Sequence, residues 1–175
     1  MDIEKITLSG LAGVGKGTTA QLLAARLGWE AVSAGELYRR LADEKGISLA
    51  ELETLATRDP SFDRDLDNYI RRYGETHRHF ICEGRLTWYF IPDAFKVKLD
   101  CDFDTRIARI ASREGISIAQ AKSQTLHRED AIRLRYRTYY QIQDFLADRN
   151  FDLVVDTTNR SPEQVVADIL THLAQ

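Results

Sequence analysis

The chain alternates short apolar runs with longer segments whose apolar residues recur at helical spacing. Five runs of three to six residues have the length and composition of buried strands: residues 3–8, 30–32, 79–82, 95–99 and 153–155. Strands that alternate with helices favour a parallel sheet with helices on both faces. We therefore predict an α/β fold with a five-stranded parallel sheet.

The segments that follow the first and the last predicted strands carry clear helix signals. The first helix has an apolar stripe, with Gly28 as its expected C-cap: Ala20, Leu23, Ala24 and Leu27. The last helix begins at the capping sequence Ser161-Pro162-Glu163-Gln164 and presents a second stripe: Val166, Ile169, Leu170 and Leu173. Both helices are predicted to cover the sheet.

The middle of the chain is more polar and is also predicted to be helical. Three sequences are typical of helix starts: Ser33 with Glu36, Ser48 with Glu51, and Ser117 with Gln120. The stretch 34–76 contains no strand pattern and is predicted to be an inserted helical lobe. Gly115 ends a helix, and the helix that starts after it is predicted to run to about residue 148, either continuously or with an interruption.

Composition limits the classes of function. The 175 residues fit one domain with a small insertion, and 24 basic against 27 acidic residues give a net charge of −3. That charge excludes a basic protein that coats duplex nucleic acid. No apolar run approaches the roughly 18 residues of a membrane span, and the first residues lack the features of a signal peptide. Cys82 and Cys101 share no metal-binding spacing, so we expect reduced core thiols in a cytoplasmic protein.

The strongest chemical signal is a glycine-rich turn between the first strand and the first helix. Its residues are Gly10, Leu11, Ala12, Gly13, Val14, Gly15, Lys16, Gly17 and Thr18. Glycines allow the backbone N–H groups to face one anion, and the helix adds its positive end. Lys16 is expected to reach the terminal phosphates of a nucleotide, which makes the turn a phosphate-binding loop. Gly17 stands where a strict loop of this kind has Ser or Thr, so Thr18 is the expected hydroxyl for magnesium.

The rest of the chain narrows the class of phosphate-binding-loop protein. A GTPase would carry an Asn-Lys-x-Asp sequence, which is absent from this chain. A ring-forming ATPase would need a longer chain. A small-molecule kinase fits the length, and it needs additional arginines to hold two charged phosphate groups together.

Candidate residues for this task follow the second and third strands. Glu83 and Arg85 come directly after the third strand, at the sheet edge where ligands collect in open α/β sheets. Glu83 is expected to hold magnesium through water, and Arg85 to bind a phosphate. Ser33, Gly35 and Arg39 follow the second strand at the same edge, with Arg39 as the expected ligand of the acceptor phosphate. The alternative for Glu83, Arg85 and Arg39 is that they are solvated surface residues.

A second arginine group lies on the long polar helix. Arg128 and Arg135 are seven residues apart and share a helix face, where they are suited to close over a transferring phosphoryl group. The alternatives are a solvated basic face or an RNA-binding patch, and the lack of regular aromatic interleaving disfavours RNA. Trp88, Tyr89 and Phe90 are interpreted as packing residues, with base stacking as the alternative.

Taken in order, these motifs resemble nucleoside monophosphate kinases, and most of all the short archaeal-type cytidylate kinases and the cytidylate-kinase-like proteins. The resemblance runs from about residue 3 to about 172. Its markers are Gly15-Lys16-Gly17-Thr18, Val32-Ser33-Ala34-Gly35-Glu36, Glu83-Gly84-Arg85-Leu86, the run from Arg106 to Ser117, Arg135-Tyr136, and Phe151 to Thr157. The chain departs from many relatives by Thr87-Trp88 in place of Gly-Trp, and from adenylate kinases by Glu83 in place of Asp.

The resemblance implies a three-layer α/β/α phosphate-binding-loop kinase. It implies a core of residues 1–33, 78–113 and 138–175, a nucleoside monophosphate-binding lobe at about 34–77, and a lid at about 114–137. Lys16 and the loop would bind ATP with Mg²⁺, Arg39 and Arg85 the acceptor, and Arg128 and Arg135 would belong to the lid. Arg109 and Arg113 align with lid-hinge arginines near ATP.

The resulting expectation is an enzyme that transfers phosphate from ATP to CMP or dCMP. The alternatives are a kinase for another acceptor, such as AMP or a metabolite, and a nucleotide-binding regulator without catalysis. We expect a cytoplasmic monomer whose partners are small nucleotides and not nucleic acid or membrane. The residues that would read cytosine are not identified by the sequence.

Overall fold

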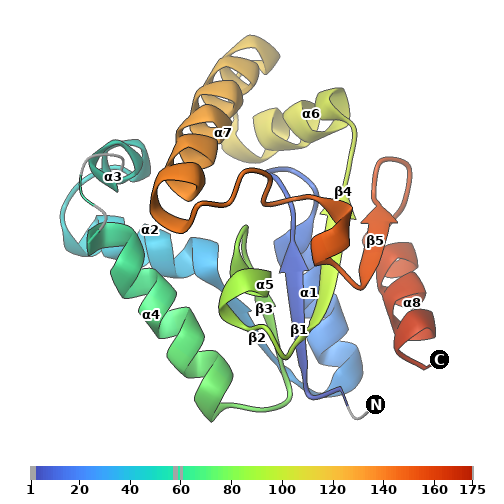
Figure 1. Ribbon diagram of the computed structural model, residues 1–175. Helices are drawn as coiled ribbons and strands as arrows, with labels where there is room; N and C mark the ends of the chain where they lie inside the picture. Colours follow the sequence, from blue (N-terminus) through green and yellow to red (C-terminus); the bar gives the residue numbers. More distant parts are fainter. Residues whose placement is uncertain (1–2, 57–58, 60, 175) are drawn as a thin grey trace.

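The computed structural model describes residues 3–56, 59 and 61–174 and contains one five-stranded sheet. The strands are β1 (Lys5–Ser9), β2 (Glu30–Ser33), β3 (Phe80–Glu83), β4 (Phe95–Asp100) and β5 (Leu153–Asp156). Their order is β2-β3-β1-β4-β5, and every neighbouring pair is parallel. All five predicted strands are therefore confirmed, with β1 at the centre (Figure 1).

The helices lie on both faces and above one edge of the sheet. They are α1 (Lys16–Leu27), α2 (Ala34–Glu44), α3 (Leu49–Ala56), α4 (Ser61–Thr76), α5 (Thr87–Phe90), α6 (Phe103–Glu114), α7 (Ile118–Tyr140) and α8 (Pro162–Leu173), with a 3₁₀ turn at Asp148–Asn150. The described part of the inserted segment is helical, as predicted. The full capping boxes at Ser117 and Ser161 are both present. None of the described helices is both long and apolar enough to cross a membrane.

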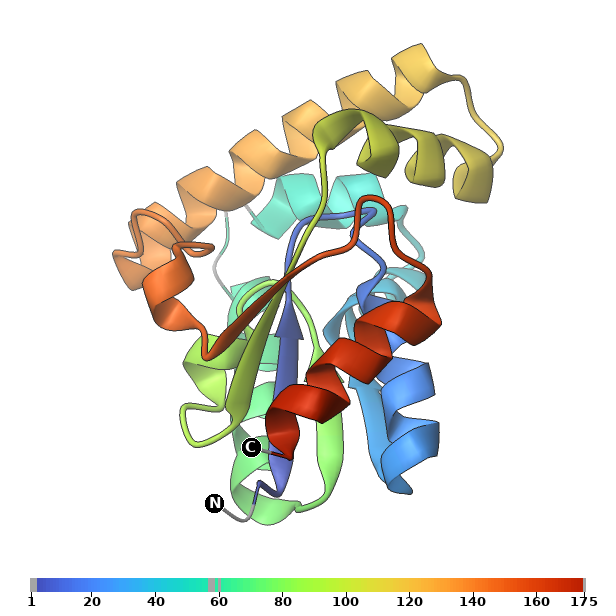
Figure 2. The same ribbon diagram turned by 90° about the vertical axis from the view of Figure 1, so that its right-hand side faces the viewer.

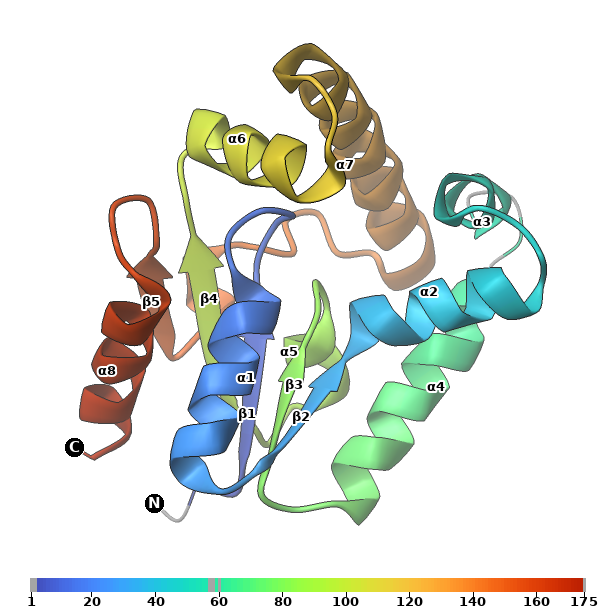
Figure 3. The same ribbon diagram turned by 180° about the vertical axis from the view of Figure 1, so that it is seen from behind.

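Two apolar layers hold the sheet. Ile6 and Leu8 of β1 belong to one buried cluster with Leu23 of α1 and Ile169 of α8. The two helices lie on the same face of the sheet, the near face in Figure 3. On the other face Phe80 and Cys82 of β3 pack against residues of α4 and α5 and against the chain that follows α7. The predicted stripes of α1 and α8 are confirmed, and the sheet is covered on both faces. Burial raises the pKa of the Cys82 thiol, which keeps it neutral.

The interruption that the sequence left open in the long helix occurs well before residue 148. The helix α7 ends at Tyr140, because Gln141 adopts a left-handed conformation with φ of 57° and its N–H donates back to the Arg137 carbonyl. The chain then turns so that Phe145 is buried in the second apolar layer, where its carbonyl accepts a hydrogen bond from Trp88 Nε1 at 3.1 Å. Burial of Phe145 against the sheet decides where the helix ends.

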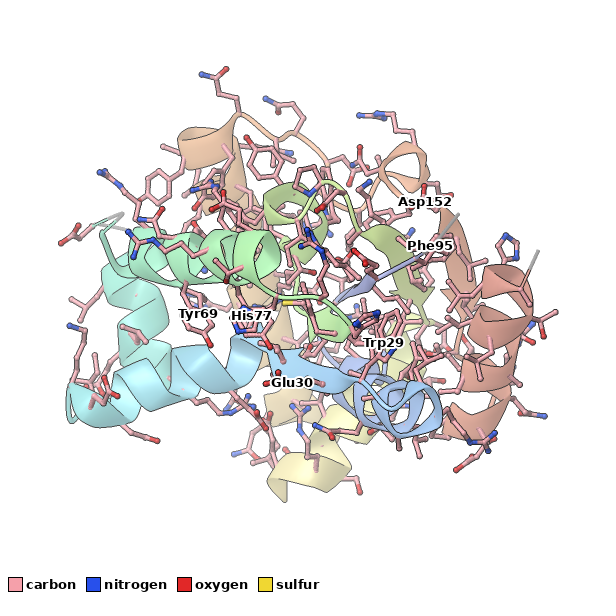
Figure 4. All side chains as sticks on the ribbon, turned by 90° about the horizontal axis from the view of Figure 1, so that it is seen from below. Trp29, Glu30, Tyr69, His77, Phe95 and Asp152 are labelled. Carbon is pink, nitrogen blue, oxygen red and sulfur yellow. The ribbon has the colours of Figure 1, made fainter. Side chains whose placement is uncertain are left out.

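The two edges of the sheet differ in character. At the amino-terminal edge, seen from below in Figure 4, aromatic side chains pack on one another: Trp29 meets His79 edge-on, and His77 stacks on Tyr73 with ring centroids 3.9 Å apart. At the carboxyl-terminal edge, α6 and α7 lie above the strands, and α7 crosses over them (Figure 2). Residues that follow β1, β2, β3 and β5 therefore come together at this edge with residues of α6 and α7.

Candidate active site

The turn between β1 and α1 has a backbone that requires glycine. Gly10 and Gly13 have φ of 152° and 86°. A Cβ atom added at Gly10 would lie 2.4 Å from the Leu99 carbonyl oxygen, and one at Gly13 would lie 2.7 Å from the Arg106 carbonyl oxygen. No side chain fits at those distances, so both positions need glycine for steric as well as conformational reasons.

Lys16 is the first residue of α1 and folds back over the turn. Its Nζ donates to the carbonyl oxygens of Gly10 and Leu11, both at 2.9 Å. Burial lowers the pKa of Lys16 to about 8; Glu83 opposes this effect, while Arg85 and Arg113 add to it. A lysine in such surroundings is suited to bind an anion, because an anion would favour the charged form of its amino group.

The residues after β2 and β3 come together at the same edge. Ser33 and Glu83 are opposite each other in the parallel register of these strands, and Ser33 Oγ donates a hydrogen bond to Glu83 Oε1. A Cβ atom at Gly35 would lie 3.6 Å from Arg39 Nη1 and 4.0 Å from Glu83 Oε1. The structure therefore places Ser33, Gly35, Arg39 and Glu83 side by side, as the sequence predicted.

One cavity of about 660 Å³ connects these groups with the phosphate-binding loop. The predicted residues that line it are Ala12, Gly13, Val14, Gly15, Lys16, Gly17, Thr18, Gly35, Arg39, Glu83, Arg85, Arg109, Arg113, Arg128 and Arg135. Gly10, Leu11 and Ser33 do not line the cavity but form the hydrogen bonds described above with Lys16 and Glu83, which do. Arg135 is only 5 % exposed, so the alternative of a solvated basic face does not hold for it. Arg128 is half-buried and also faces the cavity.

Arg109 has a structural contact that the sequence did not indicate. Its guanidinium donates to the Gly13 carbonyl at 3.3 Å and to the Thr157 carbonyl at 2.7 Å. Thr157 Oγ1 in turn donates to the Val14 carbonyl at 3.0 Å. The end of β5 is thus tied to the phosphate-binding loop, and Arg109 lines the cavity while it supports the loop.

Arg106 and Glu129 form a buried ion pair that sequence reasoning missed. Arg106 Nη1 donates to Glu129 Oε1 at 2.7 Å and to the Ala12 carbonyl at 3.0 Å, and the two side chains are 5 % and 10 % exposed. The pair joins α6 and α7 to the phosphate-binding loop. Both residues lie in polar stretches of the chain and are 23 positions apart, so no local sequence pattern indicates that they form a pair.

A model of the cytidylate kinase-like family matches residues 5–159. The chain belongs to this family. It is 41% identical over 167 residues to a cytidylate kinase of Haloquadratum walsbyi, covering 94% of this chain and 86% of that protein. It is 36% identical to a cytidylate kinase of Methanobrevibacter smithii, covering 96% and 97% of the two chains.

Solved structures support the fold of this cytidylate kinase-like protein. A structure of a protein from Eubacterium ventriosum aligns with a TM-score of 0.73 at 16% identity, covering 98% of this chain and 99% of that one. A shikimate kinase from Acinetobacter baumannii aligns with a TM-score of 0.67 at 16% identity, covering 99% and 94%. At these identities the likeness concerns the three-layer α/β/α kinase fold, which confirms the predicted fold class.

The residues of the cavity fit a nucleotide-bound magnesium ion. Thr18 and Glu83 both line it and carry side-chain oxygens of the kind that magnesium prefers. The described residues contain no cluster of three or more His, Cys, Asp or Glu side chains arranged to hold a metal. Magnesium is commonly held by one or two carboxylates together with water and substrate phosphates, so this pair of residues is suited to a metal that arrives with the nucleotide.

Proposed function

We propose that the protein transfers the γ-phosphoryl group of ATP to CMP or dCMP, which yields ADP and the cytidine diphosphate. The observation that carries the proposal is the shared cavity. It joins the phosphate-binding loop at the end of β1 with the arginine-lined edge of β2 and β3 in a member of the cytidylate kinase-like family. Two phosphorylated substrates that enter it from these two sides would meet at their phosphates.

The arrangement supports direct transfer without a covalent enzyme intermediate. The loop N–H groups, the start of α1 and Lys16 would hold the phosphates of ATP. Arg39 and Arg85 would hold the acceptor phosphate, whose second pKa near 6 leaves it ionised at neutral pH. An ionised acceptor oxygen needs no general base, so the protein contributes positioning and charge neutralisation.

The remaining cations of the cavity would act on the transferring group. Arg128 and Arg135 of α7 face the cavity from above, and Arg109 and Arg113 of α6 face it beside the phosphate-binding loop. Negative charge develops on the oxygens of the transferring phosphoryl, and preorganised cations stabilise it in a site that excludes water. Thr18 and Glu83 would hold magnesium, which would neutralise part of the charge of the ATP phosphates.

We also propose that different segments of the chain have different roles in the reaction. Residues 34–77 would bind the acceptor, residues 114–137 would form a lid, and residues 1–33, 78–113 and 138–175 would form the core. We further propose that the protein acts as a cytoplasmic monomer on free nucleotides, without nucleic acid or membrane as partner. Most residues proposed for the reaction line one cavity of the described chain, which supports a monomer.

A panel of nucleoside monophosphates tests the reaction. ADP formation from Mg-ATP should be fastest with CMP or dCMP, and slower with UMP, AMP and GMP. If turnover is fastest with AMP or with a metabolite, that compound is the acceptor and not a cytidine nucleotide. ATP binding without acceptor-dependent turnover would instead indicate a nucleotide-binding regulator. Lys16→Ala should leave the fold intact and reduce kcat by orders of magnitude, because Lys16 acts on charge that grows during transfer.

The proposed acceptor contacts have their own test. Arg39→Ala and Arg85→Ala should each raise the KM for CMP by roughly 10- to 100-fold, since a hydrogen bond to a charged group contributes about 1.5–3 kcal/mol. The KM for ATP should change much less. Arg133→Ala, an exposed arginine of α7, is the matched control. A larger effect on ATP than on CMP would show that the two sites are assigned in reverse.

A further inference from the structure

The part of the cavity that belongs to α3, α4, α5 and the end of α7 differs from the arginine-lined part. Its walls are largely apolar and aromatic: Leu49, Leu66, Ile70, Phe90 and Tyr136. Among the described residues that line the cavity, the carboxylates are Glu83, at the end of β3, and Asp67, on α4. Asp67 therefore contributes a negative charge to the apolar part of the cavity, where a carboxylate needs hydrogen-bond donors to be stable.

Tyr140 holds Asp67 in place. The Tyr140 hydroxyl donates a hydrogen bond to Asp67 Oδ2, which connects α4 to the last residue of α7. The tyrosine ring itself is fixed by neighbours, with its centroid 5.6 Å from that of Phe90 and 6.0 Å from that of Tyr136. An ionised carboxylate accepts up to about four hydrogen bonds, so the contacts that Asp67 already makes are compatible with a further donor from a ligand.

The size and chemistry of this region suit a nucleotide base. Phe90, Tyr136 and Tyr140 offer aromatic surface for a flat ring, and Leu66 and Ile70 complete the apolar wall. A base bound there would lose its hydrogen bonds with water. Each donor on the base would then need an acceptor from the protein, and each acceptor would need a donor.

We infer that Asp67, oriented by Tyr140, is the residue that selects the cytosine base; this inference rests on the proposed function. Cytosine presents an N4 amino group as a donor, and aspartate is a side chain that accepts from this group. Uracil presents the O4 oxygen at the same place, which a carboxylate repels. Asp67 therefore favours CMP by attraction and disfavours UMP by repulsion. Adenine also carries an amino group beside a ring nitrogen, so Asp67 alone does not separate CMP from AMP.

Substitution of Asp67 by its amide provides a direct test. Asp67→Asn keeps the size of the side chain and adds an NH₂ group that donates to uracil O4. The ratio of kcat/KM for CMP to that for UMP should fall by about 10- to 100-fold, the range expected for one good base contact. Equilibrium binding of CMP and UMP without ATP should show the same change in ratio. Glu75→Gln, the same chemical change at an exposed position of α4 outside this cavity, should leave the ratio unchanged.

Tyr140→Phe tests whether Tyr140 positions Asp67. It is also the second test of the inference if Asp67→Asn does not fold. It removes one hydroxyl, and the CMP-to-UMP ratio should fall several-fold while ATP binding is retained. An unchanged ratio in folded Asp67→Asn, with both pyrimidines weakened equally, would assign Asp67 a structural role and overturn the inference while the proposed function stands. A wild-type protein that phosphorylates no cytidine nucleotide would overturn the proposed function and this inference together.

Discussion

Protonation of Lys16 should couple ATP binding to pH. In the free protein burial and the nearby arginines lower the pKa of Lys16 to about 8. Bound phosphates would raise this pKa again, because they favour the charged form of the lysine. Above pH 7, Lys16 is then protonated to a greater extent in the ATP complex than in the free protein. The affinity for ATP should therefore decrease as the pH rises.

The size of the change in ATP affinity follows from the fraction of Lys16 that is protonated at each pH. With a pKa of about 8, Lys16 is about nine-tenths protonated at pH 7 and about one-tenth protonated at pH 9. The affinity for Mg-ATP should therefore fall about tenfold between these pH values. At pH 8 each binding event should take up about half a proton, and the phosphates, with a pKa near 6, contribute little to that uptake.

Isothermal titration calorimetry at pH 8 in buffers of different ionisation enthalpy measures the proton uptake directly. Lys16→Arg is the matched control, because a guanidinium stays charged across this range and its binding should not depend on pH in this way. Equal pH profiles for wild type and Lys16→Arg, with no proton uptake at pH 8, would mean that Lys16 is already fully charged in the free protein.

The lowered pKa of Lys16 should also affect folding stability, which should change with pH in the opposite direction to the affinity for ATP. The ordinary pKa of a lysine is 10.5, so between pH 8 and 10.5 the unfolded chain holds the Lys16 proton more tightly than the folded protein does. Stability contributed by Lys16 should therefore rise with pH across this window. Urea unfolding at pH 7.5 and 9.5, compared with Lys16→Met, isolates the contribution of this residue.

Three further predictions concern the scaffold of the site. Glu129→Ala leaves Arg106 as a buried charge without its carboxylate, so the free energy of unfolding in urea should fall by about 3–5 kcal/mol, and a loss under about 1 kcal/mol would mean that the pair is solvated. Gly10→Ala places a Cβ atom 2.4 Å from the Leu99 carbonyl oxygen, and ATP binding should be lost; wild-type affinity would contradict the steric argument. Amide hydrogen exchange in residues 114–137 should slow on addition of a two-substrate analogue, and slow less with ATP alone. Protection in the free protein equal to that of the central strands would refute a mobile lid.

Local patterns in the sequence were enough for most of the fold. The five strands are short apolar runs, and the capping boxes at Ser117 and Ser161 are recognised from residues three positions apart. The phosphate-binding loop is also a local feature, because its glycines, its lysine and the adjoining strand and helix are contiguous. Parallel strands then bring Ser33, Glu83 and the loop to one edge, so part of the site could be predicted as well.

Contacts between distant parts of the chain were decided by the tertiary structure. The helix α7 ends at Tyr140 because Phe145 is buried against the sheet, and the polar sequence before it carries no sign of that packing. The partnership of Asp67 with Tyr140 joins residues 73 positions apart. Neither residue has a local pattern that marks it as functional.

The general reason is that periodicity and capping depend on neighbours within a few residues, whereas burial depends on the whole chain. Lys16 is a conspicuous residue in the sequence, and its role as a phosphate ligand is predicted from the motif alone. Its lowered pKa follows only from the arginines and the protein interior that the fold gathers around it. The sequence by itself determined the sheet and the kind of chemistry at its edge; the tertiary structure decided which charges are buried and which side chains lie where the acceptor base would bind.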